Sequence, residues 1–159
     1  MNKLAFIGGT GVYDAGILSD IRSEIINTPF GQAACQIGYF KGKEIVFLAR
    51  HGTGHTIPPH KINYRANIYA LKMLEVSSIV STTAVGSLNP EYKPGELVLI
   101  DQFLDMTKSR NGTFFDGEFR GVAHIDMTNP YCQTLRNVII QDKMKNEIAV
   151  IAIPPNKEP

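Results

Sequence analysis

The sequence has few cysteines and no long hydrophobic run, and each absence excludes a class of protein. Its two cysteines, Cys35 and Cys132, are too few for a disulfide framework, so buried free thiols in a reducing compartment are expected. No apolar run approaches the length that spans a membrane. The apolar stretch at residues 1–7 is too short for the apolar region of a signal peptide. The expected location is therefore the cytoplasm.

The chain also lacks an excess of charge of either sign. The formal net charge is +1, charged residues make up 19% of the chain, and no block of like charges occurs, which argues against a nucleic-acid or membrane surface. The 159 residues are 43% hydrophobic, an ordinary balance for one globular domain with its own core. We expect a single α/β domain over residues 1–153 and a disordered tail over residues 154–159.

Two nucleotide-binding motifs are absent from a place where either would fit. An apolar run at residues 4–7 predicts a strand, and residues 8–11 (Gly-Gly-Thr-Gly) follow it directly. The Rossmann pattern needs a glycine where Asp14 stands, and the Gly-Lys-Ser/Thr ending of a P-loop is missing. Glycines after a strand let the backbone turn sharply and approach a ligand closely, although a purely structural turn is the alternative.

The most informative stretch is residues 49–65, which holds three of the four histidines together with two arginines, a lysine and two threonines. It lies between a predicted buried strand, residues 45–48, and a predicted helix that continues through residues 66–74. A cationic, hydroxyl-rich loop in that position predicts an anion site. The alternative is a metal site, but the spacing of the three histidines matches no zinc pattern and no acidic residue lies nearby, so no metal is expected.

Hydrophobic patterning and turn residues predict an α/β domain with a mixed central sheet flanked by helices. Asn63 is the expected helix cap, and Tyr64 and Met73 are expected to pack within the protein rather than contact a ligand. The other predicted elements are a hairpin of residues 35–39 and 44–48, strands at 78–83, 96–101 and 148–153, a long loop at 106–121, and a helix from Pro130 to about Lys145.

Potential anion donors follow three predicted strands at their carboxyl ends: Thr10, then Arg50 and His51, then Thr83 and Ala84. Ligands of open α/β sheets gather at such ends. Hydroxyls, backbone N–H groups and a guanidinium together suit a phosphate. The alternatives are a surface ion pair for Arg50, a core position for His51, and structural hydroxyls for the two threonines.

Several separate motifs, in the same order, resemble those of the trimeric purine nucleoside phosphorylases, and most resemble the methylthioadenosine and methylthioinosine phosphorylase branch. The resemblance extends from about Leu4 to about Arg136. The motifs that carry it are residues 7–11, 50–52, 55–67, 82–88, 94–98, 101–105, 115–117 and 121–127.

This resemblance implies a nucleoside phosphorylase fold and a pentosyltransferase of purine salvage that is a homotrimer or hexamer. Its substrates would be phosphate and a purine nucleoside, with no metal and no organic cofactor. It implies that Thr10, Arg50, His51, Thr83 and Ala84 hold the phosphate, with Arg50 and His51 as the catalytic residues. It also implies that His124 faces the 5′ substituent of the sugar in a neighbouring subunit's pocket, with an ordinary loop histidine as the alternative.

The resemblance also implies distal segments that shape the purine pocket, hold the ribose and protonate the leaving base, and the chain does not contain them. Residues that choose between adenine and hypoxanthine would lie there too. We therefore expect a C-terminally truncated member that retains the phosphate half of the site. The alternative function is a non-catalytic remnant that binds phosphate.

Overall fold

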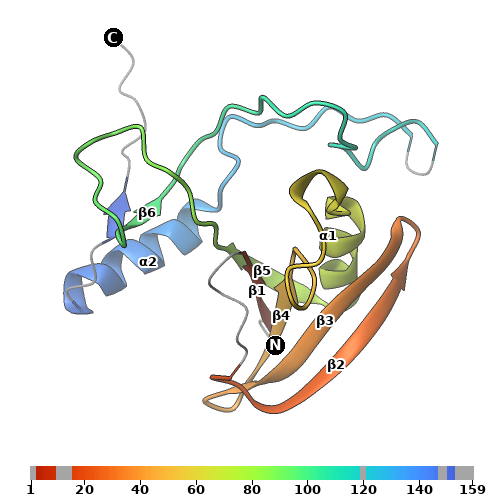
Figure 1. Ribbon diagram of the computed structural model, residues 1–159, viewed down its shortest axis with the longest axis horizontal. Helices are drawn as coiled ribbons and strands as arrows, with labels where there is room; N and C mark the ends of the chain where they lie inside the picture. Colours follow the sequence, from red (N-terminus) through yellow and green to blue (C-terminus); the bar gives the residue numbers. More distant parts are fainter. Residues whose placement is uncertain (1–2, 10–15, 119–120, 147–149, 153–159) are drawn as a thin grey trace. The chain divides into compact units, whose positions relative to one another are not determined.

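The computed structural model describes residues 3–9, 16–118, 121–146 and 150–152 of the chain (Figure 1). Two compact units are present, and each is described by itself. The first comprises Met1–Val85 and Ser109–Phe119, and the second comprises Gly86–Lys108 and Arg120–Pro159. The single domain over residues 1–153 stays a prediction, and the tail expected at residues 154–159 lies outside the described residues.

A five-stranded mixed sheet forms the first unit, as predicted (Figure 1). Its strand order is β2-β3-β4-β1-β5, in which β2, β3 and β4 are antiparallel neighbours and β4, β1 and β5 are parallel neighbours. The strands are β1 Lys3–Gly8, β2 Ser19–Thr28, β3 Gly31–Phe40, β4 Lys43–Ala49 and β5 Val76–Ser81. The mixed topology places three parallel strand ends at one edge of the sheet.

The predicted hairpin is confirmed as β3 and β4, joined at Lys41 and Gly42. Both turn residues have positive φ, 49° and 74°, which glycine adopts without steric cost. Strand β2, which pairs with β3 at the sheet edge, has no counterpart among the predicted strands. Its apolar side chains Ile21 and Ile25 are 44% and 66% exposed, and Ile26 is only partly buried, so no strongly buried face marks this strand in the sequence.

The core lies on both faces of the central strands. Because side chains alternate along a strand, Val46 and Leu48 of β4 point to one face and Ile45 and Phe47 to the other, and all four are buried. The first pair belongs to the main hydrophobic cluster, which also includes Leu71 of the helix α1. Burial on both faces is what produces the continuous apolar run of β4 in the sequence.

Helix α1, Tyr64–Met73, begins at the predicted cap, because the Asn63 side chain accepts a hydrogen bond from the Ala66 backbone N–H at 3.0 Å. A short 3₁₀ turn, η1 Pro59–Lys61, precedes it. The helix buries Ala66, Ala70 and Leu71. Lys72 stands in its last turn, where the helix dipole favours a cation.

The second unit contains two short parallel strands, β6 Leu97–Leu99 and β7 Val150–Ala152, and the helix α2 Gln133–Asn146. Helix α2 therefore starts after Pro130, the residue where it was expected to begin. The buried Arg136 donates to the Ile100 carbonyl through its guanidinium. Of the predicted loop at 106–121, the described residues contain no helix or strand. Among the described helices, none is both long enough and apolar enough to cross a membrane.

Candidate functional site

The candidate site lies where β4, β1 and β5 end side by side. After β4, the Arg50 backbone N–H donates to the Gly8 carbonyl at 3.2 Å. After β5, the Thr82 N–H donates to the Ile7 carbonyl at 3.0 Å. Both neighbouring strands are therefore tied to β1 at their carboxyl ends, which is where α/β sheets hold ligands. The predicted convergence is confirmed for these ends, whereas Thr10 lies outside the described residues.

The Arg50 side chain links β4 to the end of β5. Its Nη1 donates to the Thr82 carbonyl at 2.5 Å, and its Nη2 donates to the Thr83 hydroxyl at 2.9 Å. A guanidinium has five N–H donors in a planar fork; two of them donate here, and no hydrogen bond of the other three is seen among the described residues. These two contacts fix the plane of a permanently charged group, so Arg50 is preorganised toward an anion rather than mobile on the surface.

His51 is buried, with 6% of its surface exposed, and a polar contact orients its ring. Its Nδ1 lies 2.9 Å from the Ile57 carbonyl. A carbonyl only accepts, so we assign the ring hydrogen to Nδ1. With the hydrogen on Nδ1, Nε2 of the neutral ring carries a lone pair and can only accept. Nε2 can donate to an anion only in the doubly protonated imidazolium form. The backbone N–H of His51 is the donor that does not depend on protonation.

The loop after β4 is closed on itself by backbone hydrogen bonds. The Ile57 N–H donates to the His51 carbonyl at 2.8 Å, so these two residues are joined in both directions. The His51 and His55 rings stack, with centroids 4.4 Å apart and planes 19° from parallel. Gly52 has φ of 73°, and a Cβ there would lie 2.9 Å from the Thr56 hydroxyl oxygen. Glycine at this position therefore permits the tight turn that brings His55 back over His51.

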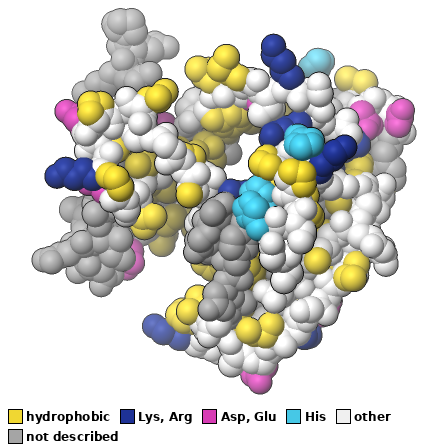
Figure 2. Space-filling view, viewed as in Figure 1, with side chains coloured by type: hydrophobic (Ala, Val, Ile, Leu, Met, Phe, Trp, Pro, Cys, Tyr) yellow, Lys and Arg dark blue, Asp and Glu magenta, His cyan; other side chains and the backbone are white. Residues whose placement is uncertain are grey.

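These residues surround a depression of about 480 Å³, which we call the Arg50 pocket. Its lining residues are Arg50, His51, His55, Pro59, Tyr64, Ser81, Thr83 and Ala84. None of the lining residues is acidic, and Arg50 supplies the one permanent positive charge among them. Figure 2 shows histidine side chains gathered beside Lys and Arg side chains on one face. The electrostatics of the pocket favour an anion, and its volume exceeds that of a phosphate alone.

Tyr64 was expected to contribute to helix packing rather than to contact a ligand, and its position in the structure favours the second role. Its side chain is 39% exposed and lines the Arg50 pocket. As the first residue of α1 it stands at the end of the helix that meets the preceding loop, before the buried stripe begins at Ala66. Met73, at the other end of the helix, is also exposed, at 51%. Terminal turns of a short helix can carry apolar side chains that never reach the core, and helical spacing alone does not reveal this.

Other residues of the pocket carried no prediction as site residues: His55, Pro59 and Ser81. Ser81 is the last residue of β5 and lies two residues before the predicted Thr83, so the strand boundary was the available signal. His55 and Pro59 belong to the stretch at residues 49–65 that already indicated an anion site.

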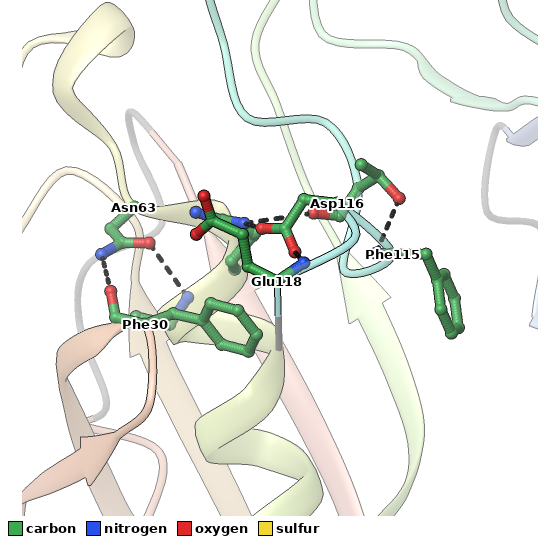
Figure 3. Close-up of polar contacts among 8 residues, drawn as sticks. Phe30, Asn63, Phe115, Asp116 and Glu118 are labelled. Carbon is green, nitrogen blue, oxygen red and sulfur yellow. Dashed lines mark hydrogen bonds and ion pairs between the residues drawn. The ribbon is translucent and has the colours of Figure 1, made fainter. Parts of the chain in front are cut away.

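A cluster of polar and aromatic contacts surrounds the start of α1, where Tyr64 lies, and Figure 3 shows the polar contacts of Asn63 and Asp116. The Asn63 side chain caps α1 and also donates to the Phe30 carbonyl at 2.6 Å. The Arg65 guanidinium donates to the Asp116 carboxylate at 2.6 Å and lies 4.8 Å above the Phe30 ring. Three segments that are distant in sequence thus meet at the start of α1: the β2–β3 turn, the helix itself and residues 109–118.

Two other predictions concern His124 and metal ligands. His124 lies in the second unit, where it is exposed and outside helices and strands. Its role at a neighbouring subunit stays a prediction, as do the ligand roles of Arg50, His51, Thr83 and Ala84. Within the described ranges, no group of three or more His, Cys, Asp or Glu side chains is placed to hold a metal ion.

Fold and site together define an α/β protein with a fixed guanidinium and threonine hydroxyls at the carboxyl ends of parallel strands, an arrangement suited to a small anion. Residues 3–153 match the family described as the Phosphorylase superfamily. The chain belongs to this superfamily.

Individual relatives agree with this assignment. The chain is 53% identical over 139 residues to a probable 6-oxopurine nucleoside phosphorylase of Moorella thermoacetica, covering 87% of the chain and 54% of that protein. It is 54% identical over 139 residues to an S-methyl-5′-thioadenosine phosphorylase of Hyperthermus butylicus, covering 86% of the chain and 50% of that protein. The chain spans about half the length of the curated relatives it matches.

The backbone of the chain also resembles that of a solved structure. The methylthioadenosine phosphorylase of Schistosoma mansoni in complex with adenine superposes with a TM-score of 0.87 at 37% sequence identity. The match covers 93% of this chain and 55% of that one. The predicted fold class and the resemblance to nucleoside phosphorylases are therefore confirmed.

Proposed function

We propose that the chain is the phosphate-binding part of a purine nucleoside phosphorylase. The substrates would be inorganic phosphate and S-methyl-5′-thioadenosine, S-methyl-5′-thioinosine or a related 6-oxopurine nucleoside. The observation that carries the proposal is the Arg50 guanidinium, which donates to Thr82 and Thr83 and has further N–H donors without a partner in the described part of the chain. The names of the relatives support the nucleoside as the second substrate.

In the proposed reaction a phosphate oxygen forms a bond to the anomeric carbon of the sugar while the glycosidic C–N bond breaks. The electron pair of that bond goes to the purine nitrogen, which takes a proton, and the products are the free base and a sugar 1-phosphate. Positive charge develops on the sugar in the transition state. A phosphate fixed next to the sugar stabilises this charge, so donors that hold the phosphate in place lower the barrier.

The predicted phosphate-binding residues have distinct parts in this proposal. Arg50 neutralises most of the phosphate charge and offers it a planar fork. The Thr83 hydroxyl accepts from Arg50 at 2.9 Å, so its own hydrogen is free to donate to the phosphate. The backbone N–H groups of His51 and Ala84, with Thr10 from the loop after β1, would complete the set of donors.

We further propose that the protein works in purine salvage in the cytoplasm, as a homotrimer or hexamer in which His124 reaches the 5′ substituent of a neighbour's substrate. The motif resemblance supports this assembly. Base preference between adenine and hypoxanthine would be decided by segments of the relatives that lie beyond the matched half. The second candidate, a phosphate-binding remnant without catalysis, rests on that same half-length match.

The test uses the 159-residue chain with methylthioadenosine, methylthioinosine and inosine, each with and without phosphate, and measures release of free base. Phosphate-dependent release that Arg50→Ala abolishes would establish the phosphorylase. Because hydrogen bonds to a charged group contribute about 1.5–3 kcal/mol, Arg50→Ala should weaken phosphate binding by about 10- to 100-fold. Arg22→Ala, which removes an exposed arginine of β2, is the matched control.

The same preparation separates the two candidates. If no base appears but phosphate raises the melting temperature of the wild type and not of Arg50→Ala, the chain binds phosphate without catalysis. If phosphate has no effect on either protein, the assignment of the Arg50 pocket to phosphate is wrong.

A further inference from the structure

Gly9 is buried directly after β1, and it lies against the Arg50 side chain. A Cβ added to Gly9 would lie 2.1 Å from Nη2, 2.5 Å from Cζ and 2.7 Å from Nη1 of Arg50. All three atoms belong to the guanidinium, and all three distances are shorter than real Cβ atoms show. The charged group therefore occupies the space that any side chain at residue 9 would need.

Backbone conformation does not explain this glycine. Gly9 is not among the described glycines with positive φ, in contrast to Gly52 with φ of 73°. The φ of Gly9 therefore lies outside the left-handed region that favours glycine, and the observation that calls for glycine here is the lack of space. Gly112 also lacks positive φ, but a Cβ there would meet nothing within 4 Å. The contact with a guanidinium distinguishes Gly9 from Gly112.

We propose that Gly9 is a positioning residue for Arg50: its missing side chain lets the guanidinium lie on the end of β1, where Thr82 and Thr83 fix it. This inference rests on the proposed function in so far as Arg50 binds phosphate. With alanine at residue 9 the guanidinium must move by about 1 Å or more to reach ordinary contact distance. A shift of that size takes hydrogen bonds of normal length out of range, so Arg50 would lose the Thr82 carbonyl and the Thr83 hydroxyl.

The three parallel strand ends thus act together on one side chain. Arg50 follows strand β4, and the two oxygen atoms that accept from it belong to Thr82 and Thr83, which follow β5. Gly9, which follows β1, has no side chain and so leaves room for the guanidinium. The Thr82 carbonyl and the Thr83 hydroxyl fix the plane of the guanidinium, and Gly9 leaves the space that the guanidinium occupies.

The experiment is a double-mutant cycle on the 159-residue chain, with phosphate affinity measured by calorimetry. Gly9→Ala is expected to weaken phosphate binding about tenfold or more. In an Arg50→Ala background the same change should have no further effect, because the guanidinium that it displaces is gone. Gly112→Ala, the matched glycine variant in open space, should bind phosphate as the wild type does. Gly9→Ala with wild-type affinity, or with equal losses in both backgrounds, would overturn the proposal.

Melting temperatures of the same variants without phosphate give a second readout that is independent of the proposed function. Gly9→Ala should lower the melting temperature in the wild-type background and leave it unchanged or raised with Arg50→Ala, because alanine restricts the unfolded chain more than glycine does. If the wild type binds no phosphate, the proposed function fails, and this cycle still decides the role of Gly9. Equal shifts in both backgrounds would show that Gly9 does not act through Arg50.

Discussion

Arg65 and Asp116 form an ion pair of 2.6 Å that fastens residues 109–118 to the start of α1 (Figure 3). Their side chains are 20% and 29% exposed, so the pair is partly shielded from water. Arg65 also lies over the Phe30 ring, and Phe30 meets Tyr69 and Phe114 edge-on. The fastened segment carries Arg110, which lies 5.6 Å above the ring of Tyr64 in the wall of the Arg50 pocket.

Substitution of Arg65 and substitution of Asp116 should both destabilise the fold, but Arg65 should cost more. Asp116→Asn removes the ion pair alone and should lower the free energy of unfolding by about 1 kcal/mol or less. Arg65→Ala also removes the contact with the Phe30 ring and should lower it by about 1–2 kcal/mol in total. Urea unfolding measures both values, provided that the dependence of the unfolding free energy on urea concentration is the same in wild type and variants.

Salt and a charge-preserving variant serve as controls for that prediction. The effect of Asp116→Asn should shrink at about 1 M salt, because exposed parts of the pair are screened. Arg65→Lys keeps the charge and loses the planar group above Phe30, so its cost should be smaller than that of Arg65→Ala. A loss for Asp116→Asn that equals the loss for Arg65→Ala would show that the aromatic contact contributes nothing.

Features that depend on local sequence could be predicted. Apolar runs placed β1 and β4, glycine placed the β3–β4 turn, and the position of Asn63 before an amphipathic segment placed the cap of α1. The strand ends that form the site followed from these elements, because ligands collect at the carboxyl ends of parallel strands.

Features that depend on contacts between distant residues could not be predicted. Arg65 and Asp116 are 51 residues apart, and Asp116 lies in a segment without periodicity. Strand β2 is an edge strand that exposes Ile21 and Ile25, and its burial alternates only from Glu24 onward and without any fully buried side chain, so its hydrophobic pattern is weak. The contact of Gly9 with Arg50 likewise requires two neighbouring strands to be in place.

The two cysteines should differ in reactivity. Burial raises the pKa of the Cys35 thiol to about 11, with a smaller contribution from the charge of Glu24, and the residue is 2% exposed. At pH 8 about one in a thousand Cys35 thiols would then be ionised, and the thiolate is the reactive form. Cys132 is exposed. A thiol reagent at pH 8 should therefore modify one cysteine in the native chain and two in urea, and rapid modification of Cys35 in the native chain would contradict this packing.

Glu44 should make stability depend on acid pH. Hydrogen bonds from Lys3 and Arg22 lower the pKa of its carboxyl below the ordinary value. A carboxyl with a lower pKa in the folded state binds fewer protons there than in the unfolded chain, so it stabilises the fold above the unfolded pKa of about 4.3. That contribution is lost as the pH falls from about 5 through the lower folded pKa.

The measurement is urea unfolding of wild type and Glu44→Gln between about pH 3 and 6. The wild type should be more stable than the variant at pH 6, and the difference should shrink as the pH falls. In a background that lacks both partners, Lys3→Met with Arg22→Met, the Glu44→Gln change should have little pH dependence. A constant difference across the range would show that Glu44 acts by packing rather than by charge.

Thr83 should contribute to phosphate binding through Arg50 as well as directly. Its hydroxyl accepts from Arg50 Nη2, and Thr83→Val removes that acceptor while keeping the volume and the branching at Cβ. The Thr82 carbonyl still holds Nη1, so the guanidinium should be loosened rather than released. One hydrogen bond of about 1 kcal/mol corresponds to an approximately fivefold weaker phosphate affinity, and a direct contact with the anion would add to that loss.

The effect of Thr83 through Arg50 and its direct contact with phosphate can be separated with a second variant of Thr83 and with the Arg50→Ala variant. Thr83→Ser keeps the hydroxyl and should retain most of the affinity. In Arg50→Ala the part that acts through the guanidinium is absent, so any remaining loss on Thr83→Val measures the direct contact with phosphate. A full loss in that background would mean that Thr83 binds the anion by itself, and its bond to Arg50 would then be incidental to binding.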